Sequence, residues 1–304
     1  MENNKGILLE SGTNELEIIE FELQNSKFGI NVIKVKEIIQ PVPTTKIPHA
    51  HPIVEGIIQL RGEVLPVINL AKALDMEMGA EADPAKEKFI VSQFNKQSVI
   101  FRVHNVTRIH RISWEQIEKP SQMYQGSAVH VVGVIKRNDE MVLLVDFEKI
   151  LLDIDPESGI HTDRIKKLGK RERSEKRIMV AEDSPLLRKL LHDTLMEAGY
   201  VHTEFFENGK DAFAYLQKQA EQGDAAKLVD FVITDIEMPQ MDGHHLTKKI
   251  KEHSILSSIP VVIFSSLITE DLKHKGEMVG AEGQVSKPEI EELVLLMDKL
   301  MNGK

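Results

Sequence analysis

Carboxylates, hydroxyls and a lysine follow the apolar runs in the C-terminal part of the chain. These runs end in Glu182-Asp183, in Asp235, in Ser265-Ser266 and in Ser286-Lys287-Pro288. Because the carboxyl ends of parallel strands meet at one edge of an α/β sheet, we expect these groups to converge there. Neighbouring carboxylates repel one another unless a cation joins them, and oxygen ligands alone favour a hard ion such as Mg²⁺.

A cation, a lysine and a hydroxyl around one carboxylate are the groups that neutralise a phosphoryl group during its transfer. Each residue taken singly has a simpler interpretation, because an acidic residue after a strand often caps a helix or forms a turn. Glu182-Asp183-Ser184-Pro185 could be such a cap, with Ser184 at the N-cap and Pro185 in the first turn. The joint placement of these groups at successive strand ends favours the phosphoryl site.

The elements that position these residues alternate between short apolar strands and amphipathic helices. We predict strands at 177–181, 201–205, 228–234, 260–264 and 283–286, and helices at 184–198, 208–222, 244–253, 269–279 and 288–301. Strands that are apolar throughout suit a sheet covered on both faces. This alternation predicts a doubly wound, parallel α/β domain.

Four motifs occur together in this part of the chain. They are Val180-Ala-Glu-Asp-Ser-Pro185, Ile233-Thr-Asp-Ile-Glu-Met-Pro-Gln-Met-Asp-Gly243, Val262-Ile-Phe-Ser265 and Val285-Ser-Lys-Pro288. On these motifs, residues 177–302 resemble a response-regulator receiver domain. The resemblance implies a flavodoxin-like sheet in which the strands, numbered within the domain, follow the order 2-1-3-4-5.

The resemblance implies that Asp235 is the phosphoacceptor and that Ser265 and Lys287 contact the phosphoryl group. It implies a cis peptide bond before Pro288. It also implies Mg²⁺ as the cofactor, held by Glu182, Asp183, Asp235 and the backbone carbonyl of Glu237.

One position departs from the receiver pattern. Receivers usually carry Tyr or Phe three residues before the lysine, and this aromatic ring turns inward on phosphorylation, whereas this chain has Gln284. We therefore expect the signal to leave through residues 265–269 and the helix that follows them.

The first half of the chain has short β-type runs separated by turn residues. We predict strands at 16–23, 28–33, 56–60, 63–69, 89–94, 98–103, 106–112, 130–136 and 140–145, with short helices at 33–39 and 147–152. Many short strands at close spacing predict an all-β barrel or sandwich. Trp114 is expected to lie in its core.

The segment Gly56-Ile-Ile-Gln-Leu-Arg-Gly-Glu-Val-Leu-Pro-Val-Ile-Asn-Leu70 is similar to the central motif of CheW-like coupling domains, whose members usually have Asn where Gln59 stands. Phe28-Gly-Ile-Asn31, Val35-Lys-Glu-Ile38 and Met141-Val-Leu-Leu-Val-Asp146 extend the resemblance over residues 14–155. It implies two small SH3-like barrels that share a core. As partners it implies the cytoplasmic tips of chemoreceptors and the regulatory domain of a histidine kinase, bound without catalysis.

Arg61-Gly62 lies between two apolar strands and predicts a two-residue hairpin turn with a positive φ at Gly62. An arginine at a hairpin tip is by itself more often solvated than functional. The resemblance makes Leu60, Arg61 and Gly62 the candidate partner-binding residues, and arginine is enriched at interface hot spots. His49 and His51 superficially resemble a pair of metal ligands, but prolines flank them, so we expect a loop there.

Charge separates the chain into two acidic parts joined by a basic segment. Residues 1–160 contain 17 Lys+Arg and 23 Asp+Glu, residues 161–177 contain 8 and 3, and residues 178–304 contain 13 and 22. Acidic surfaces repel phosphate backbones, so we expect no nucleic-acid partner. The basic segment, residues 156–176, is interpreted as a solvated linker.

The composition excludes several classes of protein. The chain has no cysteine, which excludes disulfides and thiolate metal sites. No apolar run approaches the length of a membrane span and the start does not resemble a secretory signal, so we expect a cytoplasmic protein without membrane insertion.

The two resemblances together match the CheV-type family of chemotaxis coupling proteins, with a CheW-like domain at 14–155, a linker at 156–176 and a receiver at 177–302. The expected function is an adaptor at membrane-associated receptor arrays that couples chemoreceptors to the histidine kinase. Coupling would be modulated by phosphoryl transfer from the kinase phosphohistidine to Asp235. No enzymatic activity is expected beyond the receiver's own phosphorylation and dephosphorylation. The alternative is a phosphate sink that drains phosphoryl groups from the kinase.

Overall fold

The computed structural model describes residues 15–76, 83–94, 97–118, 130–137, 140–156, 159–160, 165, 168–169, 171–222 and 229–302. Contacts within the chain divide these residues into two compact units, the first of which is Glu15–Pro156. The second contains the described residues from 159 to 302. We call them the N-terminal and C-terminal domains.

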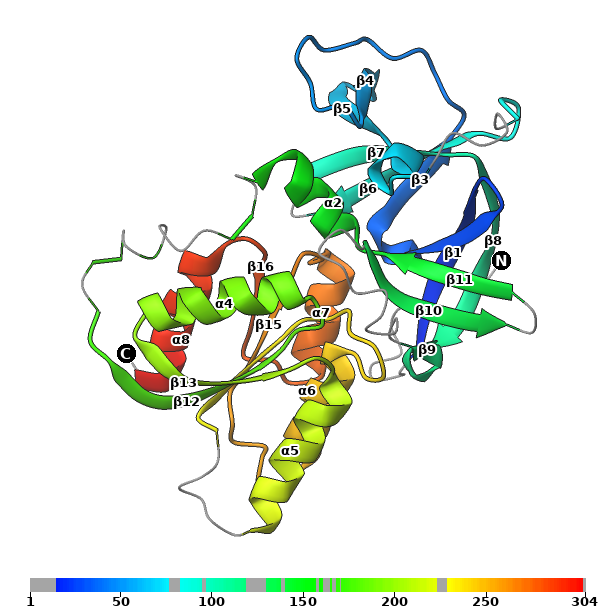
Figure 1. The fold of residues 1–304 in the computed structure, drawn as a ribbon. Coiled ribbons are helices and arrows are strands. Elements are labelled where there is room, and N and C mark those ends of the chain that lie inside the picture. Colours follow the sequence, from blue (N-terminus) through cyan, green and yellow to red (C-terminus); the bar gives the residue numbers. More distant parts are fainter. Residues whose placement is uncertain are drawn as a thin grey trace. The chain divides into compact units, whose positions relative to one another are not determined.

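The N-terminal domain is built from two sheets (Figure 1). The first has the strand order β8-β1-β2-β11-β10-β9, with β1 Glu15–Leu23, β2 Ser26–Asn31, β8 Asn105–Ser113, β9 Ile117–Glu118, β10 Val131–Arg137 and β11 Glu140–Val145. The second has the order β3-β6-β7-β5-β4, with β3 Val35–Ile39, β4 Val54–Leu60, β5 Glu63–Asn69, β6 Lys88–Phe94 and β7 Gln97–Val103. Among the described residues of this domain, two α-helices accompany them, α1 Leu70–Ala73 and α2 Phe147–Ile154, together with 3-10 turns at Val32–Lys34 and Trp114–Gln116.

Each sheet has its own core, and a third core joins them. Trp114 lies in the core of the first sheet, as the sequence predicted. The shared core contains residues of both sheets and the first turn of α2. Phe147 is at its centre, with its ring centroid 4.8 Å from that of Phe101, 5.8 Å from that of Phe94 and 6.4 Å from that of Phe21. The predicted pair of barrels with a common core is confirmed.

Replacing Phe147 with alanine is expected to destabilise the N-terminal domain by about 3–5 kcal/mol, because it removes a buried ring and leaves a cavity. Trp114 is the single tryptophan of the chain and lies in this domain, so its fluorescence in urea titrations reports the unfolding of this domain alone. Val64→Ala is the control, because Val64 is 62% exposed and its loss should change stability by less than about 0.5 kcal/mol. Equal urea midpoints for the two variants would contradict the central role of Phe147.

The predicted helix at 33–39 is wrong. A short 3-10 turn, Val32–Lys34, leads directly into strand β3, which pairs with β6 in antiparallel fashion and places Ile38 opposite Ile90. The apolar residues of this segment have helical spacing, but they are β-branched valines and isoleucines, which favour strands. Pairing with β6 therefore makes this segment a strand and not a helix.

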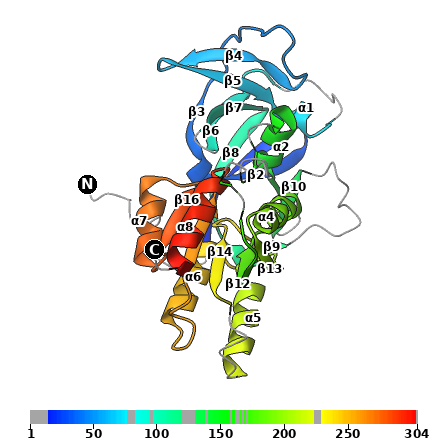
Figure 2. The ribbon, with the colours of Figure 1, turned by 90° about the vertical axis from the view of Figure 1, so that its left-hand side faces the viewer.

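The C-terminal domain has five parallel strands in the order β13-β12-β14-β15-β16, which is the predicted 2-1-3-4-5 order. Figure 2 labels β12, β13, β14 and β16 among the helices of this domain. The strands are β12 Ser174–Ala181, β13 Tyr200–Phe206, β14 Phe231–Thr234, β15 Val261–Ser265 and β16 Gly283–Ser286. The helices are α4 Pro185–Glu197, α5 Gly209–Glu221, α6 Gly243–Glu252, α7 Glu270–Met278 and α8 Ile290–Asn302. The predicted elements are confirmed apart from shifts at their ends, and residue 228 of the third predicted strand lies outside the described residues.

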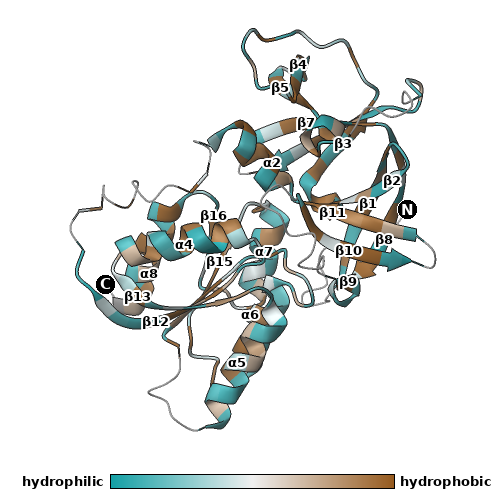
Figure 3. Cartoon of the chain, viewed as in Figure 1, coloured by the Kyte–Doolittle hydropathy of each residue, from teal (hydrophilic) through white to brown (hydrophobic). Residues whose placement is uncertain are grey.

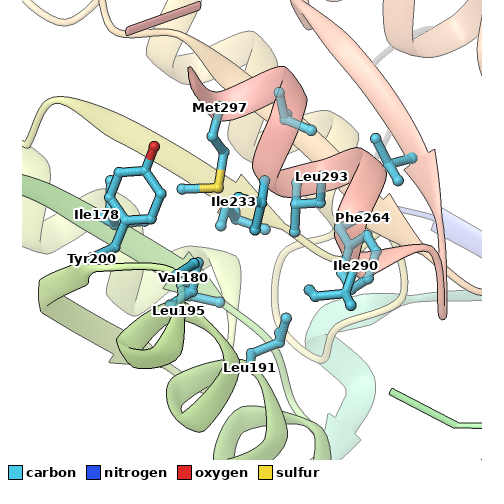
Figure 4. Close-up of a cluster of buried hydrophobic side chains, with 14 of the residues drawn as sticks. Ile178, Val180, Leu191, Leu195, Tyr200, Ile233, Phe264, Ile290, Leu293 and Met297 are labelled. Atoms are coloured by element: carbon cyan, nitrogen blue, oxygen red, sulfur yellow. The ribbon is translucent and has the colours of Figure 1, made fainter. Parts of the chain in front are cut away.

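Both faces of this sheet are covered. One face packs against α4 and α8 through a cluster that includes Val180, Leu191 and Leu293 (Figure 4). The other face packs against α5 and α6 through a second cluster that includes Val232 and Leu216. In Figure 3, α4 and α5 carry both hydrophobic and hydrophilic residues, as expected for helices that pack one side against a sheet. In the described ranges, no helix is both long and apolar enough to span a membrane.

The interpretation of residues 156–176 as a solvated linker stays a prediction, and the described residues of this segment are mixed: Pro156, Gly169, Glu172 and Arg173 are exposed, whereas others are buried. Ile160 and Ile165 are buried in the core cluster beneath α4 and α8. Arg171 forms an ion pair with Asp298 of α8 at 2.6 Å, and β12 begins at Ser174, three residues before the predicted strand. Two isoleucines within a basic run gave no periodic signal, so their burial was missed. Residues 157–158, 161–164, 166–167 and 170 of the predicted linker lie outside the described residues.

Candidate functional site

The strand ends of the C-terminal domain bring four of the predicted site residues together. Glu182 and Asp183 directly follow β12, Asp235 follows β14, and Lys287 follows β16. Main-chain hydrogen bonds tie these ends to their neighbours. The amide of Asp235 donates to the Ala181 carbonyl at 2.9 Å, and the amide of Lys287 donates to the Ser265 carbonyl at 2.9 Å.

Three carboxylates form an acidic cluster at this edge. Glu182, Asp183 and Asp235 each offer an oxygen, and the three oxygens lie within 4.8 Å of one another. Glu182 and Asp235 are buried, and Asp183 is half-buried. Such an all-oxygen donor set suits Mg²⁺, which binds through one or two carboxylates and keeps several waters. The residues present therefore fit the predicted cation.

Lys287 supplies a positive charge inside this cluster. Its side chain is 2% exposed, and Nζ lies 2.8 Å from Oε2 of Glu182 and 3.1 Å from Oδ2 of Asp235. A buried ammonium group needs such partners, because an unpaired charge is costly to remove from water. One lysine against three carboxylates leaves the group with a net negative charge, which a cation can offset.

The geometry of Asp235 is fixed by its neighbours along the chain. Its Oδ1 accepts a hydrogen bond from the Ile236 amide at 2.7 Å, and its main-chain carbonyl accepts one from Oγ1 of Thr234 at 2.9 Å. Gly243 packs against the same carbonyl, and a Cβ at this position would lie 1.9 Å from that oxygen. Only glycine therefore lets α6 begin this close to Asp235.

The remaining predicted receiver residues lie nearby. Ser265 is buried at the end of β15, the strand next to β14, and its Oγ accepts a hydrogen bond from the Leu267 amide at 3.4 Å. Glu237 is half-buried two residues after Asp235, and the use of its carbonyl as a ligand stays a prediction. The Lys287–Pro288 peptide is cis.

Gln284, which replaces the usual aromatic residue, contacts helix α7. Its Nε2 donates to the Lys273 carbonyl at 2.6 Å. Gly276 makes room for this amide, because a Cβ at Gly276 would lie 2.5 Å from the Gln284 side chain. The side chain therefore links β16 to α7 by a hydrogen bond where a receiver usually has a ring.

His244 is buried in the first turn of α6, close to the phosphoacceptor loop. Burial lowers the pKa of His244 from 6.5 to about 4, the nearby Asp242 opposes this effect, and Lys275 adds to it. A hydrogen bond with the Leu272 backbone also raises the pKa and connects the ring to α7. The imidazole is therefore neutral near pH 7.

The stability of the C-terminal domain is expected to depend on His244 between about pH 6.5 and pH 4. The folded domain binds this proton less readily than the unfolded chain, so stability is full above pH 6.5 and falls as the pH decreases toward 4. The total loss is about 3 kcal/mol. Urea unfolding followed by far-ultraviolet circular dichroism would measure it. His244→Gln should flatten this part of the profile, whereas His192→Gln, at a half-exposed position, should leave it as in the wild type; identical profiles for all three proteins would contradict the assignment.

The predicted partner-binding hairpin is exposed in the N-terminal domain. Arg61 and Gly62 form the turn between β4 and β5, with φ values of 50° and 91°, so both turn residues have positive φ rather than Gly62 alone. Both are exposed, and Leu60 is half-buried. Two further features were missed from the sequence: Glu37 of β3 pairs with Arg61 at 2.8 Å, and Val64 exposes an apolar side chain beside the turn. The Glu37 pair has no local signal, because the pairing of β3 was not predicted.

A third missed residue is Arg188, in the first turn of α4. Its Nη1 donates to the main-chain carbonyls of Glu182 and Asp183 at 2.8 and 2.7 Å. A cation in a first helical turn opposes the helix dipole, and this mismatch was a readable signal in the sequence. His49 and His51 are exposed loop residues, as predicted.

Comparisons with known proteins identify two families along the chain. The sequence matches the CheW-like domain family over residues 17–155 and the response regulator receiver domain family over residues 178–298.

Relatives match the whole chain or its first half. Chemotaxis protein CheV3 of Helicobacter pylori is 29% identical over 95% of this chain and 95% of its own length. A probable chemotaxis protein CheW of Rhizobium etli is 30% identical over 47% of this chain and 92% of its own length. Among solved structures, the scaffolding protein CheW from Thermoanaerobacter tengcongensis is 28% identical, covers 43% of this chain and 83% of its own, and has a TM-score of 0.40.

Proposed function

Because the chain belongs to the CheW-like family of chemotaxis proteins and joins that domain to a response regulator receiver domain, we propose that it couples chemoreceptors to the histidine kinase under the control of Asp235 phosphorylation. The observation that carries this proposal is the buried Lys287–Asp235 pair within the acidic cluster, on the same chain as an exposed coupling hairpin. The adaptor would act at receptor arrays.

Asp235 would accept the phosphoryl group from the phosphohistidine of the kinase. A carboxylate oxygen of Asp235 attacks phosphorus, the P–O bond forms as the P–N bond breaks, and the bonding electrons remain on the imidazole. Mg²⁺, held by Glu182, Asp183, Asp235 and the Glu237 carbonyl, would neutralise phosphoryl charge. Lys287 lies 3.1 Å from Oδ2 of Asp235 and would pair with the new phosphoryl oxygens, and Ser265 would donate its hydroxyl to them.

The exposed hairpin is the proposed contact with receptor tips or the kinase regulatory domain. Arg61 is 77% exposed and sits on a turn fixed by main-chain pairing of β4 with β5, so its guanidinium is presented on a rigid support. The neighbouring Val64 adds exposed apolar area. A rigid arginine beside an apolar residue is a combination found at the centres of interfaces.

The phosphorylation signal is expected to leave the receiver through α7. Movement of Ser265 toward the phosphoryl group would displace residues 265–269, which lead into α7, and Gln284 holds that helix by a single hydrogen bond. Hydrogen exchange with and without the phosphoryl mimic beryllofluoride should show changed protection in α7, and Gln284→Leu should enlarge the change by removing the bond. Gln219→Leu on α5 is the control. Unchanged exchange in α7 of the wild type would contradict this route.

A reconstituted assay tests the coupling function. Receptor-containing vesicles and the histidine kinase are mixed with this chain as the only coupling protein, and kinase autophosphorylation is measured. The proposal predicts receptor-dependent activation that rises with the amount of the chain added. Autophosphorylation that stays at the level of the kinase alone would contradict coupling.

A further inference from the structure

Building on the phosphorylation site proposed above, we infer that Arg188 is a positioning residue for the cation site, acting through the main chain of the acidic residues. Its side chain is 17% exposed. One nitrogen, Nη1, donates to the carbonyls of both Glu182 and Asp183, at 2.8 and 2.7 Å. The other, Nη2, lies 3.0 Å from Oε1 of Glu207, which follows β13.

This arrangement fixes the peptide planes from which the two acidic side chains project. A single nitrogen that bonds two successive carbonyls holds both at one point, and the Glu207 contact anchors the guanidinium to the neighbouring strand. Charged donors make stronger hydrogen bonds than neutral ones, so the restraint is a firm one. This main-chain restraint adds to those on the Glu182 side chain itself, whose carboxylate accepts from the Ser184 amide at 3.2 Å and from Lys287 Nζ at 2.8 Å.

Helix stability does not explain Arg188. The residue is the fourth of α4, where the positive end of the helix dipole disfavours a cation, and Ser184 already caps the helix by accepting from the Leu187 amide. The acidic cluster does explain it. Three carboxylate oxygens lie within 4.8 Å of one another, and Lys287 offsets one of their charges. The repulsion that remains favours outward movement of the loop that carries Glu182 and Asp183, and the bonds from Arg188 to its carbonyls oppose this movement.

The consequence is a site whose ligand oxygens are already close together before the cation binds. Groups that orient metal ligands without being the ligands themselves typically contribute 10- to 100-fold to metal affinity. Arg188→Ala keeps every carboxylate of the cluster in the chain, so a loss of affinity in this variant would report positioning and not the removal of a ligand.

Titration calorimetry of the full chain with MgCl₂ tests the inference. Arg188→Ala should raise the dissociation constant for Mg²⁺ by about tenfold or more. Arg188→Lys should give a smaller increase, because an ammonium group can reach the carbonyls but cannot also hold Glu207. Lys189→Ala, an exposed neighbour on α4, is the matched control and should bind Mg²⁺ as the wild type does. Urea unfolding in the absence of Mg²⁺ measures any purely structural effect of each variant.

Several outcomes are decisive. Wild-type affinity in both Arg188 variants would overturn the positioning role, whatever their stability. If Arg188→Ala does not fold, Arg188→Lys decides alone, and unchanged affinity in it would overturn the inference. A wild-type chain that binds no Mg²⁺ and accepts no phosphoryl group would instead overturn the function proposed for the cluster. Normal labelling of Asp235 together with unchanged Mg²⁺ affinity in the variants would remove Arg188 only.

Discussion

Asp235→Asn is expected to abolish phosphoryl incorporation from a phosphohistidine or a small acyl phosphate. The change removes the nucleophilic carboxylate while preserving the shape of a side chain that is 6% exposed and ordered by the Ile236 amide. Chelation of Mg²⁺ should abolish labelling of the wild type in the same way, because the acidic cluster then keeps its repulsive charge. Incorporation of radiolabelled phosphate measures both effects.

Two further variants locate the effect at Asp235. Asp193→Asn, on the exposed part of α4, should label like the wild type. Lys287→Ala should still accept the phosphoryl group but respond poorly to it, because the ammonium that pairs with Asp235 is lost. Undiminished incorporation in Asp235→Asn, or in excess chelator, would place the acceptor elsewhere.

Arg61→Ala is expected to weaken binding to the receptor–kinase complex by about 1 to 3 kcal/mol, which is about fivefold to 150-fold in the dissociation constant. The physical reason is the loss of a guanidinium that can pair bidentately with a partner carboxylate. Phosphorylation of Asp235 should be unaffected, because that site lies in the other domain. Co-sedimentation with receptor vesicles and kinase measures the binding.

Glu37→Gln is the matched control for Arg61. It removes the negative charge that faces the guanidinium at 2.8 Å but keeps the guanidinium itself on the turn. If Arg61 acts on the partner, Glu37→Gln should bind with near wild-type affinity, whereas a purely structural ion pair would give equal losses in both variants. Equal sedimentation of wild type and Arg61→Ala would remove Arg61 from the partner-binding residues.

The receiver site was predictable because the alternation of strands and helices determines which residues end each strand, and the parallel topology places those ends together. Parallel strands joined by helices place their carboxyl ends at one edge, and the long side chains of Glu182 and Lys287 reach across β14 and β15 to bring Oε2 and Nζ to 2.8 Å. Most of the N-terminal strands, and the hairpin that pairs β4 with β5, were predictable from alternating apolar residues and turns. Strand β3 was not, because it pairs with β6 through contacts that neither segment encodes by itself.

The features that sequence reasoning missed depend on long-range packing. Ile160 and Ile165 lie in a polar, basic segment, and their burial requires the surface that α4 and α8 provide. The link from Gln284 to α7 was missed for a related reason: it needs Gly276 to leave space for the amide, and that pairing of residues follows from helix placement. Composition and periodicity report on residues that are close in sequence. They do not report on contacts between residues that are distant in sequence and meet only in the folded domain.

The most direct test of the account compares wild type and Asp235→Asn in the reconstituted receptor–kinase assay, with and without a small phosphodonor that the kinase does not need. Both proteins should support receptor-dependent kinase activity without the donor, because the coupling domain is unchanged. Addition of the donor should change the activity supported by the wild type and leave that supported by Asp235→Asn as it was. If the donor leaves the kinase activity supported by both proteins unchanged, phosphorylation-controlled coupling is contradicted. If the chain only lowers kinase phosphorylation by draining phosphoryl groups through Asp235, coupling control is also contradicted and the phosphate sink is favoured.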